Sequence, residues 1–288
     1  MTVEANPGTV TKDSVRALAG AGINRFSLGV QSFDDGELKA LGRIYGSGDV
    51  LRAIDAVRGA GIWNLSLDLM YGIPGQTRDA WSAHIGRAIG HGPQHISTYE
   101  LTVEPGTPLH EAVSRGETGK PDDDTIVAMY EDVIDRLTAA GYRHYEISNF
   151  AKPGFECRHN INYWNRGEYI GVGAGAHSFI NGRRIRNFSR IDRYNETVEH
   201  GRLPVEEETE TGRVDAIKEF IMLGLRKTEG VDLRLCRAEF GFDLAGSCAT
   251  MIGQGLMTTG DGFIRLTRKG IILSNSVIAE LFRAAEKA

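Results

Sequence analysis

Residues 64–77 read NLSLDLMYGIPGQT, and this stretch shows most clearly the repeating unit of the predicted fold. A short apolar run bounded by turn residues is typical of a strand, so we expect one over 64–70. The Gly and Pro residues of YGIPG at 71–75 predict a tight turn, and residues 77–89 predict a helix. The stretch is therefore one strand–turn–helix unit.

The same rhythm extends in both directions from this unit. Further strands are expected at 2–5, 25–30, 95–101 and 142–147. Further helices are expected at 34–41, 49–60 and 122–140, and one begins after Thr11, which occupies an N-cap position. Strands that alternate with helices predict βα units around a parallel sheet, and ligands bind at the carboxyl edge of such sheets.

The pattern changes after residue 148. An irregular polar loop is expected over 148–177, and it ends in the Gly-rich run GVGAGAH at 171–177. Asn181-Gly182 predicts a β-hairpin. An acidic linker is expected next, with Glu206, Glu207, Glu208 and Glu210. Helices at 214–225, 233–239 and 244–256, a turn at 259–262 and a last helix through Phe282 then predict a winged-helix-like module.

The composition is that of an ordinary globular protein, with 288 residues, 41% hydrophobic and 25% charged. The net charge of −5 argues against a nucleic-acid binder, because such proteins usually carry a basic face. No apolar run reaches the ~18 residues of a transmembrane helix, and MTVEANPGTV does not resemble a signal peptide, so we expect a cytoplasmic protein. The three cysteines, Cys157, Cys236 and Cys248, are too widely spaced for a disulfide framework or a metal motif.

Four polar residues lie in or near the ends of the predicted strands: Glu4, Gln31, Arg43 and Asp68. Glu4 suits an ammonium group and Arg43 suits a carboxylate. Gln31 and Asp68 suit the hydroxyls of a ribose. Together they predict a site for a zwitterionic nucleoside. The alternative is that they are rim residues that pair with one another.

Four blocks, in this order, resemble the HemN/HemW branch of the radical SAM superfamily: VEANPGT at 3–9, RFSLGVQSF at 25–33, LGR at 41–43 and DLMYGIPGQT at 68–77. The resemblance implies an α/β fold, with a partial (β/α)6 radical-SAM barrel missing its first units and a small carboxy-terminal winged-helix-like α+β domain. It implies that Glu4, Gln31, Arg43 and Asp68 contact S-adenosylmethionine. It also implies two domains: 1–200, a truncated barrel with its Gly-rich and HNxxYW extension, and 201–288, a HemN carboxy-terminal-type domain.

The chain departs from this family at the cluster motif. The family carries Cys-x3-Cys-x2-Cys after its first strand, and thiolates at this spacing hold a [4Fe–4S] cluster. The motif is absent here, and Cys157, Cys236 and Cys248 have other spacings. We therefore expect an amino-terminally truncated copy of the family that ligates no cluster itself and does not cleave S-adenosylmethionine.

The run CRHNINYW at 157–164 resembles the HNxxYW signature of the heme-binding HemW group. The resemblance implies heme contact by His159, with Tyr163 and Trp164 packing on the porphyrin and Cys157 as a further candidate ligand. Imidazole and thiolate are both ordinary axial ligands of heme iron. The alternative is that His159 and Trp164 anchor a long loop against the barrel.

These observations favour a HemW-like heme chaperone that binds heme for delivery to recipient hemoproteins and keeps a half-site for S-adenosylmethionine. An oxygen-independent coproporphyrinogen III oxidase is the first alternative. A barrel enzyme or binding module without S-adenosylmethionine chemistry is the second. We expect no nucleic-acid partner and no transmembrane segment, and the resemblance leaves homodimerisation open.

Overall fold

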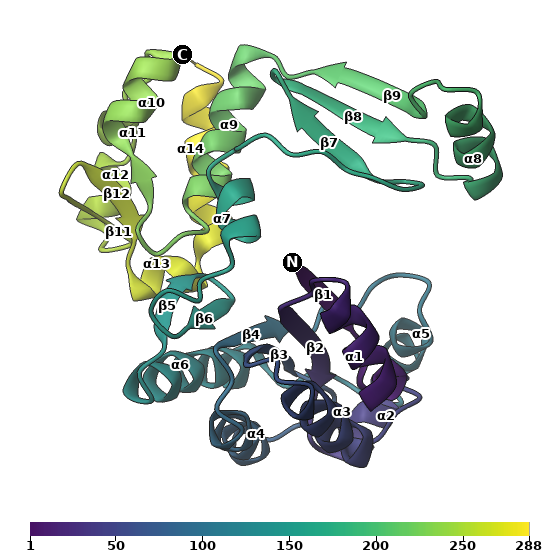
Figure 1. Ribbon diagram of the computed structural model, residues 1–288. Coiled ribbons are helices and arrows are strands. Elements are labelled where there is room, and N and C mark those ends of the chain that lie inside the picture. The colour runs from purple at the N-terminus through teal and green to yellow at the C-terminus, as the bar shows by residue number, and fades with distance from the viewer. Residues whose placement is uncertain (288) are drawn as a thin grey trace. The chain divides into compact units, whose positions relative to one another are not determined.

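The structure is a computed structural model that describes residues 1–287 (Figure 1). Two compact units divide the chain, residues 1–156 and the remainder from Cys157 onward. This division by packing does not test the expected domain ranges of 1–200 and 201–288, which stay a prediction. No helix among residues 1–287 is both long and apolar enough to cross a membrane.

A six-stranded sheet forms the centre of the first unit. Four neighbouring strands are parallel, as the βα rhythm predicts: β1 (Thr2–Ala5), β2 (Arg25–Gln31), β3 (Asn64–Tyr71) and β4 (His95–Glu100). The order across the sheet is β1-β2-β3-β4-β6-β5, so β1 forms one edge.

Helices connect these strands, and five of them begin after a Thr or Asp whose side chain caps the first turn. They are η1 (Pro7–Thr9), α1 (Lys12–Gly20), α2 (Asp35–Ala40), α3 (Ser47–Gly59), α4 (Arg78–Gly90), α5 (Pro108–Ser114) and α6 (Asp123–Ala139). The Thr11 hydroxyl accepts a hydrogen bond of 3.1 Å from the Ser14 amide, which confirms the predicted N-cap of α1. Such a cap satisfies an amide that the first turn of a helix leaves unpaired.

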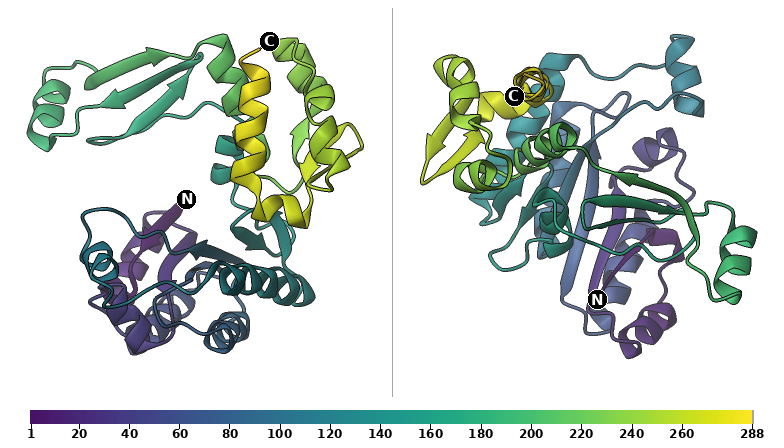
Figure 2. Two further views of the ribbon diagram at one scale, coloured as in Figure 1. Left: turned by 180° about the vertical axis from the view of Figure 1, so that it is seen from behind. Right: turned by 90° about the horizontal axis from the view of Figure 1, so that it is seen from above.

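The two faces of β3 differ in polarity. Leu65, Leu67 and Leu69 have no exposed surface, and helices cover one side of the sheet (Figure 2). Trp81 of α4 is also fully buried, and its Nε1 donates a hydrogen bond of 3.1 Å to the Met129 carbonyl of α6. Side chains alternate along a strand, so Ser66 and Asp68 lie on the opposite face, where the candidate site forms.

The far end of the sheet differs from the expected order. β5 (Arg143–Glu146) confirms the strand predicted at 142–147. A further strand, β6 (Asn149–Ala151), inserts between β4 and β5 and is antiparallel to both, where the sequence predicts a loop. All three residues of β6 are buried, so tertiary packing decides this strand.

A helix and a three-stranded antiparallel sheet open the second unit (Figure 1). They are α7 (Arg158–Trp164), β7 (His177–Ile180), β8 (Arg183–Asn187) and β9 (Val205–Glu210), with α8 (Ile191–Glu199) between β8 and β9. The hairpin predicted at Asn181-Gly182 joins β7 to β8. Both turn residues have positive φ, 51° and 74°, as a type I′ turn requires.

Two expectations for this region are wrong. Residues 158–164 form helix α7 in place of a loop, because the segment packs against α9 (Arg213–Gly224), which local sequence does not reveal. The acidic linker is strand β9, which contains Glu206, Glu207, Glu208 and Glu210. Arg183 and Arg186 of β8 donate to Glu208 and Glu207 at 2.7 and 3.0 Å, so opposite charges pair across the two strands.

The rest of the second unit is a helical module with a small sheet. It contains α9, α10 (Leu233–Phe240), α11 (Leu244–Ser247), α12 (Ala249–Gly253), α13 (Arg268–Ile272) and α14 (Ser274–Ala285), with strands β10 (Val231–Asp232), β11 (Met257–Gly260) and β12 (Phe263–Leu266). Its core is apolar and includes Ile217, Ile221 and Leu281. The predicted turn at 259–262 joins β11 to β12. The single helix expected at 244–256 is divided into α11 and α12.

Candidate functional site

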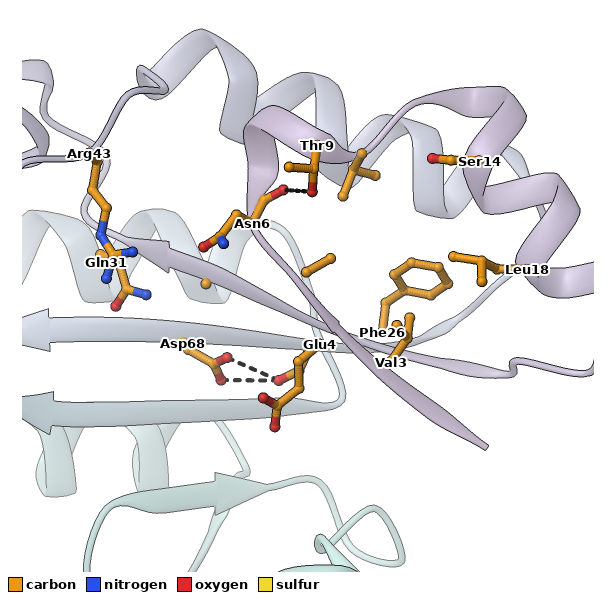
Figure 3. A pocket seen from close by; sticks show the side chains of 14 residues that line it. Val3, Glu4, Asn6, Thr9, Ser14, Leu18, Phe26, Gln31, Arg43 and Asp68 are labelled. Atoms are coloured by element: carbon orange, nitrogen blue, oxygen red, sulfur yellow. Dashed lines mark hydrogen bonds between the residues drawn. The ribbon is translucent and has the colours of Figure 1, made fainter. Parts of the chain in front are cut away.

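The four predicted ligand residues lie around one cavity of about 680 Å³ in the first unit (Figure 3). They come from separate elements: Glu4 from β1, Gln31 from the end of β2, Asp68 from β3 and Arg43 from the segment after α2. The fold therefore brings together residues that are up to 64 positions apart in the sequence.

The acidic part of the cavity is organised by hydroxyl groups. Oδ1 of Asp68 accepts a hydrogen bond of 2.7 Å from Ser97, and the Ser27 hydroxyl lies 3.2 and 3.1 Å from its two carboxylate oxygens. Burial raises the pKa of Asp68, the hydroxyl hydrogen bonds oppose this rise, and the negative charge of Glu4 adds to it. A ligand that brings a cation or hydroxyl donors would relieve the repulsion between the two acids.

Gln31 and Arg43 contribute an amide and a guanidinium to the same cavity (Figure 3). Gln31 has a φ of 63° at a register shift between β2 and β3, and left-handed backbone at a residue other than Gly often marks a functional site. Nε of Arg43 is buried and has no hydrogen-bond partner within residues 1–287. A guanidinium N–H without an acceptor suits a carboxylate ligand.

Gly29 keeps the wall of the cavity open. A Cβ at this position would lie 2.9 Å from Nε2 of Gln31 and 3.5 Å from Oδ1 of Asn6. A side chain there would therefore displace the Gln31 amide, whereas the distance to Asn6 is an ordinary van der Waals contact.

The sequence prediction missed a buried polar row that continues from Asp68 across the sheet. Ser66 Oγ lies 2.8 Å from Nδ1 of His95, and Nε2 of His95 lies 2.8 Å from the Tyr145 hydroxyl. Burial, with a smaller contribution from the charge of Arg25, lowers the pKa of His95 to about 3, so the ring is neutral. Strand alternation would have predicted Ser66, which lies on the same face of β3 as Asp68. The parallel pairing of β3 with β4 places His95 opposite Ser66.

The second predicted group lies on α7 in the second unit. His159 is exposed and Tyr163 is half-buried one turn later, with ring centroids 4.6 Å apart. Tyr169 continues the contact at 4.5 Å from Tyr163. We call these three residues the α7 aromatic row. A spacing of four residues places His159 and Tyr163 on one face of the helix.

The other two predicted heme residues lie at the ends of α7. Cys157 precedes the first turn, is half-buried, and its thiol donates to Oδ1 of Asn160 at 3.4 Å. Trp164 is the last residue of the helix, and its buried Nε1 has no acceptor in the part of the chain that the structure describes.

The remaining cysteines belong to the core of the helical module. Cys236 and Cys248 have no exposed surface, and burial raises their pKa values to about 11 and about 12. Within residues 1–287, no group of three or more His, Cys, Asp or Glu side chains is arranged to hold a metal ion.

Comparisons with known proteins match both parts of the chain. The profile of the Radical SAM superfamily matches residues 1–88, and that of the HemN C-terminal domain matches residues 213–273. Heme chaperone HemW of Bacillus subtilis is 36% identical over 279 residues, which cover 96% of this chain and 74% of that protein. Heme chaperone HemW of Escherichia coli is 38% identical over 295 residues, with coverages of 99% and 75%. The chain belongs to the HemW family of radical SAM proteins.

Relatives of this HemW family chain extend to animals. Radical S-adenosyl methionine domain-containing protein 1, mitochondrial, of Mus musculus is 31% identical and covers 100% of the chain and 69% of that protein. Among solved structures, coproporphyrinogen III oxidase (HemN) from Escherichia coli superposes with a TM-score of 0.78 at 19% identity, over 97% of this chain and 68% of that one. At this identity the superposition shows the fold alone, and it confirms the α/β radical-SAM fold expected from the sequence.

Membership of the superfamily implies S-adenosylmethionine and a [4Fe–4S] cluster. The cavity fits the first, because its two carboxylates, its amide and the unfilled donor of Arg43 complement ammonium, hydroxyl and carboxylate groups. When bound, S-adenosylmethionine would supply a sulfonium centre that can be cleaved by one-electron reduction. The described residues offer no ligand set for the cluster.

Proposed function

We propose that this chain is a HemW-like heme chaperone, which binds heme and passes it to recipient hemoproteins. Two relatives named Heme chaperone HemW, 36% and 38% identical over nearly the whole chain, support the proposal. The single observation that carries it is the exposed imidazole of His159 at the start of the α7 aromatic row.

The chemistry of the α7 aromatic row matches heme. Imidazole is a common axial ligand of heme iron, and the rings of Tyr163 and Tyr169 supply flat apolar surface beside His159. Trp164 and Cys157 stay secondary candidates. The unfilled Nε1 of Trp164 suits a propionate acceptor, and the Cys157 thiol would have to ionise before it could bind iron.

We further propose that Glu4, Gln31, Arg43 and Asp68 hold S-adenosylmethionine. In this arrangement Arg43 pairs with the carboxylate of the methionine moiety and Glu4 with its ammonium group. Asp68 and Gln31 take the ribose hydroxyls. The opposed charges at Glu4 and Arg43 and the open wall at Gly29 support this assignment.

A heme titration tests the first proposal. Hemin added to the wild-type chain is expected to give a Soret band that saturates near one equivalent, and His159→Ala is expected to shift the band and weaken binding about tenfold or more. His200→Ala is the matched control, because His200 is also exposed at a helix end in the same unit. Cys157→Ser distinguishes thiolate from imidazole ligation. A His159→Ala spectrum and affinity equal to those of wild type would remove His159 from the site.

The oxidase alternative has no specific observation in its favour. The superposition on coproporphyrinogen III oxidase is at 19% identity and shows the fold alone, whereas the relatives above 35% identity have the chaperone name.

A further inference from the structure

One carboxylate near the cavity of the first unit, that of Glu37 on α2, accepts three hydrogen bonds on a single oxygen. Oε2 of Glu37 lies 2.6 Å from Ser32 Oγ, 3.0 Å from Gln76 Nε2 and 3.0 Å from Nε2 of His84. The Glu37 side chain is 11% exposed, and Glu37 is not among the residues that line the cavity. We call Glu37, Ser32, Gln76 and His84 the Glu37 cluster.

The first hydrogen bond of the Glu37 cluster, from Ser32, fixes the turn after β2. Ser32 directly follows Gln31, the residue with a φ of 63°. The Ser32 hydroxyl donates to Glu37 and accepts a hydrogen bond of 3.0 Å from the Asp34 amide. The turn that sets the direction of the Gln31 side chain is thus tied to α2.

The second hydrogen bond of the cluster, from Gln76, fixes the turn after β3. Gln76 donates to Glu37, and its Oε1 accepts a hydrogen bond of 2.9 Å from the amide of Gly72. Gly72 has a φ of 74°. One amide side chain therefore connects the backbone of the 71–75 turn to the same carboxylate.

The helix that carries Glu37 also leads to Arg43. The Arg43 amide donates a hydrogen bond of 2.9 Å to the carbonyl of Leu38, the residue next to Glu37. His84 of α4 contacts the same carboxylate oxygen beside Ser32, at 3.4 Å from the Ser32 hydroxyl, and is itself buried. The Glu37 cluster thus joins the segments of Gln31 and Arg43 to the body of the unit.

The Glu37 carboxylate is largely buried, which normally disfavours its charged form. Burial raises the pKa of Glu37, but the hydrogen bonds from His84, Ser32 and Gln76 outweigh it, so the pKa lies below its ordinary value. The ionised carboxylate is therefore the form that satisfies all three donors, and a neutral side chain would leave at least one of them without a full partner.

We propose that Glu37 is a positioning residue of the S-adenosylmethionine site. It ties the Gln31 turn, through Ser32, and the 71–75 turn, through Gln76, to helix α2, which leads to Arg43. The inference rests on the proposed S-adenosylmethionine site and deepens it. Glu37 touches no ligand in this scheme, and it acts through the two turns.

The test is calorimetric titration of the full chain with S-adenosylhomocysteine, a soluble ligand that retains the carboxylate, ammonium and ribose groups. Glu37→Gln is expected to weaken binding about tenfold, as the loss of one charge-assisted hydrogen bond predicts. Glu100→Gln is the matched control, since Glu100 lies at the end of β4 and pairs with Lys120 at 2.7 Å on the surface. It should bind as wild type does.

Hydrogen exchange provides a readout that does not depend on the ligand. Exchange is expected to rise in residues 31–37 and 71–77 of Glu37→Gln and to stay unchanged in residues 143–151. Gln76→Ala removes only the contacts of Gln76 with Glu37 and Gly72, and it is expected to raise exchange in residues 71–77 alone. This variant still tests the proposal if Glu37→Gln does not fold.

The outcomes separate the two proposals. If wild type does not bind S-adenosylhomocysteine, the proposed ligand site is overturned. If wild type binds and Glu37→Gln binds equally well, or if exchange in both turns is unchanged, the positioning role is overturned and the ligand site stands.

Discussion

The Ser97 hydroxyl on β4 donates a hydrogen bond of 2.7 Å to Oδ1 of Asp68 on β3. Because Ser27 on β2 also donates to the same carboxylate, three adjacent strands converge on one side chain. The carboxylate that we assign to ribose recognition is therefore oriented by the sheet itself, before any ligand arrives.

Removal of this hydroxyl should reduce ligand affinity. Ser97→Ala takes one donor from Asp68, so its pKa should rise further and its orientation should be less restricted. We expect S-adenosylhomocysteine to bind about fivefold more weakly at pH 7, which corresponds to about 1 kcal/mol for one hydrogen bond. Calorimetry checks this, with Ser276→Ala, an exposed serine of α14, as the control. Equal affinity in Ser97→Ala would exclude a role for the Ser97–Asp68 contact.

Buried His95 should make stability depend on pH. Its pKa is about 3 in the folded protein, against an ordinary value of 6.5, so below pH 6.5 the unfolded chain takes up a proton that the folded chain does not. The contribution to stability is thus present above pH 6.5 and is lost as the pH falls toward 3. Relative to His95→Gln, wild type should lose up to about 1.4 kcal/mol per pH unit in this window.

Urea unfolding at pH 7.5, 6.0 and 5.0 measures this difference. His200→Gln is the control, since His200 is exposed and the variant should follow the wild-type profile. A constant offset between wild type and His95→Gln at all three pH values would contradict the assignment of a neutral buried ring.

The ion pairs of Glu219 should contribute more to stability than the exposed pair of Arg183 and Glu208 between β8 and β9. Glu219 of α9 contacts Arg166 and Arg184 at 3.0 and 2.8 Å, and the Arg166 and Glu219 side chains are only 13% and 19% exposed. Both guanidinium groups also stack on Phe179. Glu219→Gln should lower the free energy of unfolding by about 2 kcal/mol, because it removes the shorter carboxylate contact of the partly buried Arg166 and leaves only the contact with Glu239 at 3.7 Å.

Glu208→Gln is the matched comparison for this pair. It breaks the exposed contact of Glu208 with Arg183 and should cost less than about 1 kcal/mol. Thermal and urea unfolding of both variants measure which one loses more free energy of unfolding. Equal losses would show that burial does not set the strength of these ion pairs.

Gly171, next to the α7 aromatic row, should not tolerate a side chain. A Cβ there would collide with the backbone carbonyl of His177, and Asn187 donates to the Gly171 carbonyl at 3.3 Å. Gly171→Ala should therefore cost about 2 kcal/mol of stability through overpacking. Gly253→Ala has no atom in its way and should be neutral in the same unfolding measurement. A stable Gly171→Ala would mean that the segment can move away from β7.

Much of the fold follows from local sequence signals. The N-cap at Thr11, the hairpin at Asn181-Gly182 and the turn at 259–262 were predictable because each depends on a few adjacent residues with fixed conformational preferences. Strand β6, helix α7 and the strand character of β9 were not. Their residues are polar or mixed in pattern, and contacts with distant segments decide their conformation.

The candidate site divides in the same way. The sequence alone indicated that Glu4, Gln31, Arg43 and Asp68 lie close together, because they stand at or near strand ends and parallel strands deliver them to one region. All four line the cavity, but most of its other lining residues were not predicted. How these side chains are held depends on contacts that form only in the folded unit. Ser27, Ser97, His95 and Glu37 act across strands and turns that are far apart in the chain, and the hydrogen bonds that link them exist only when the sheet register is formed.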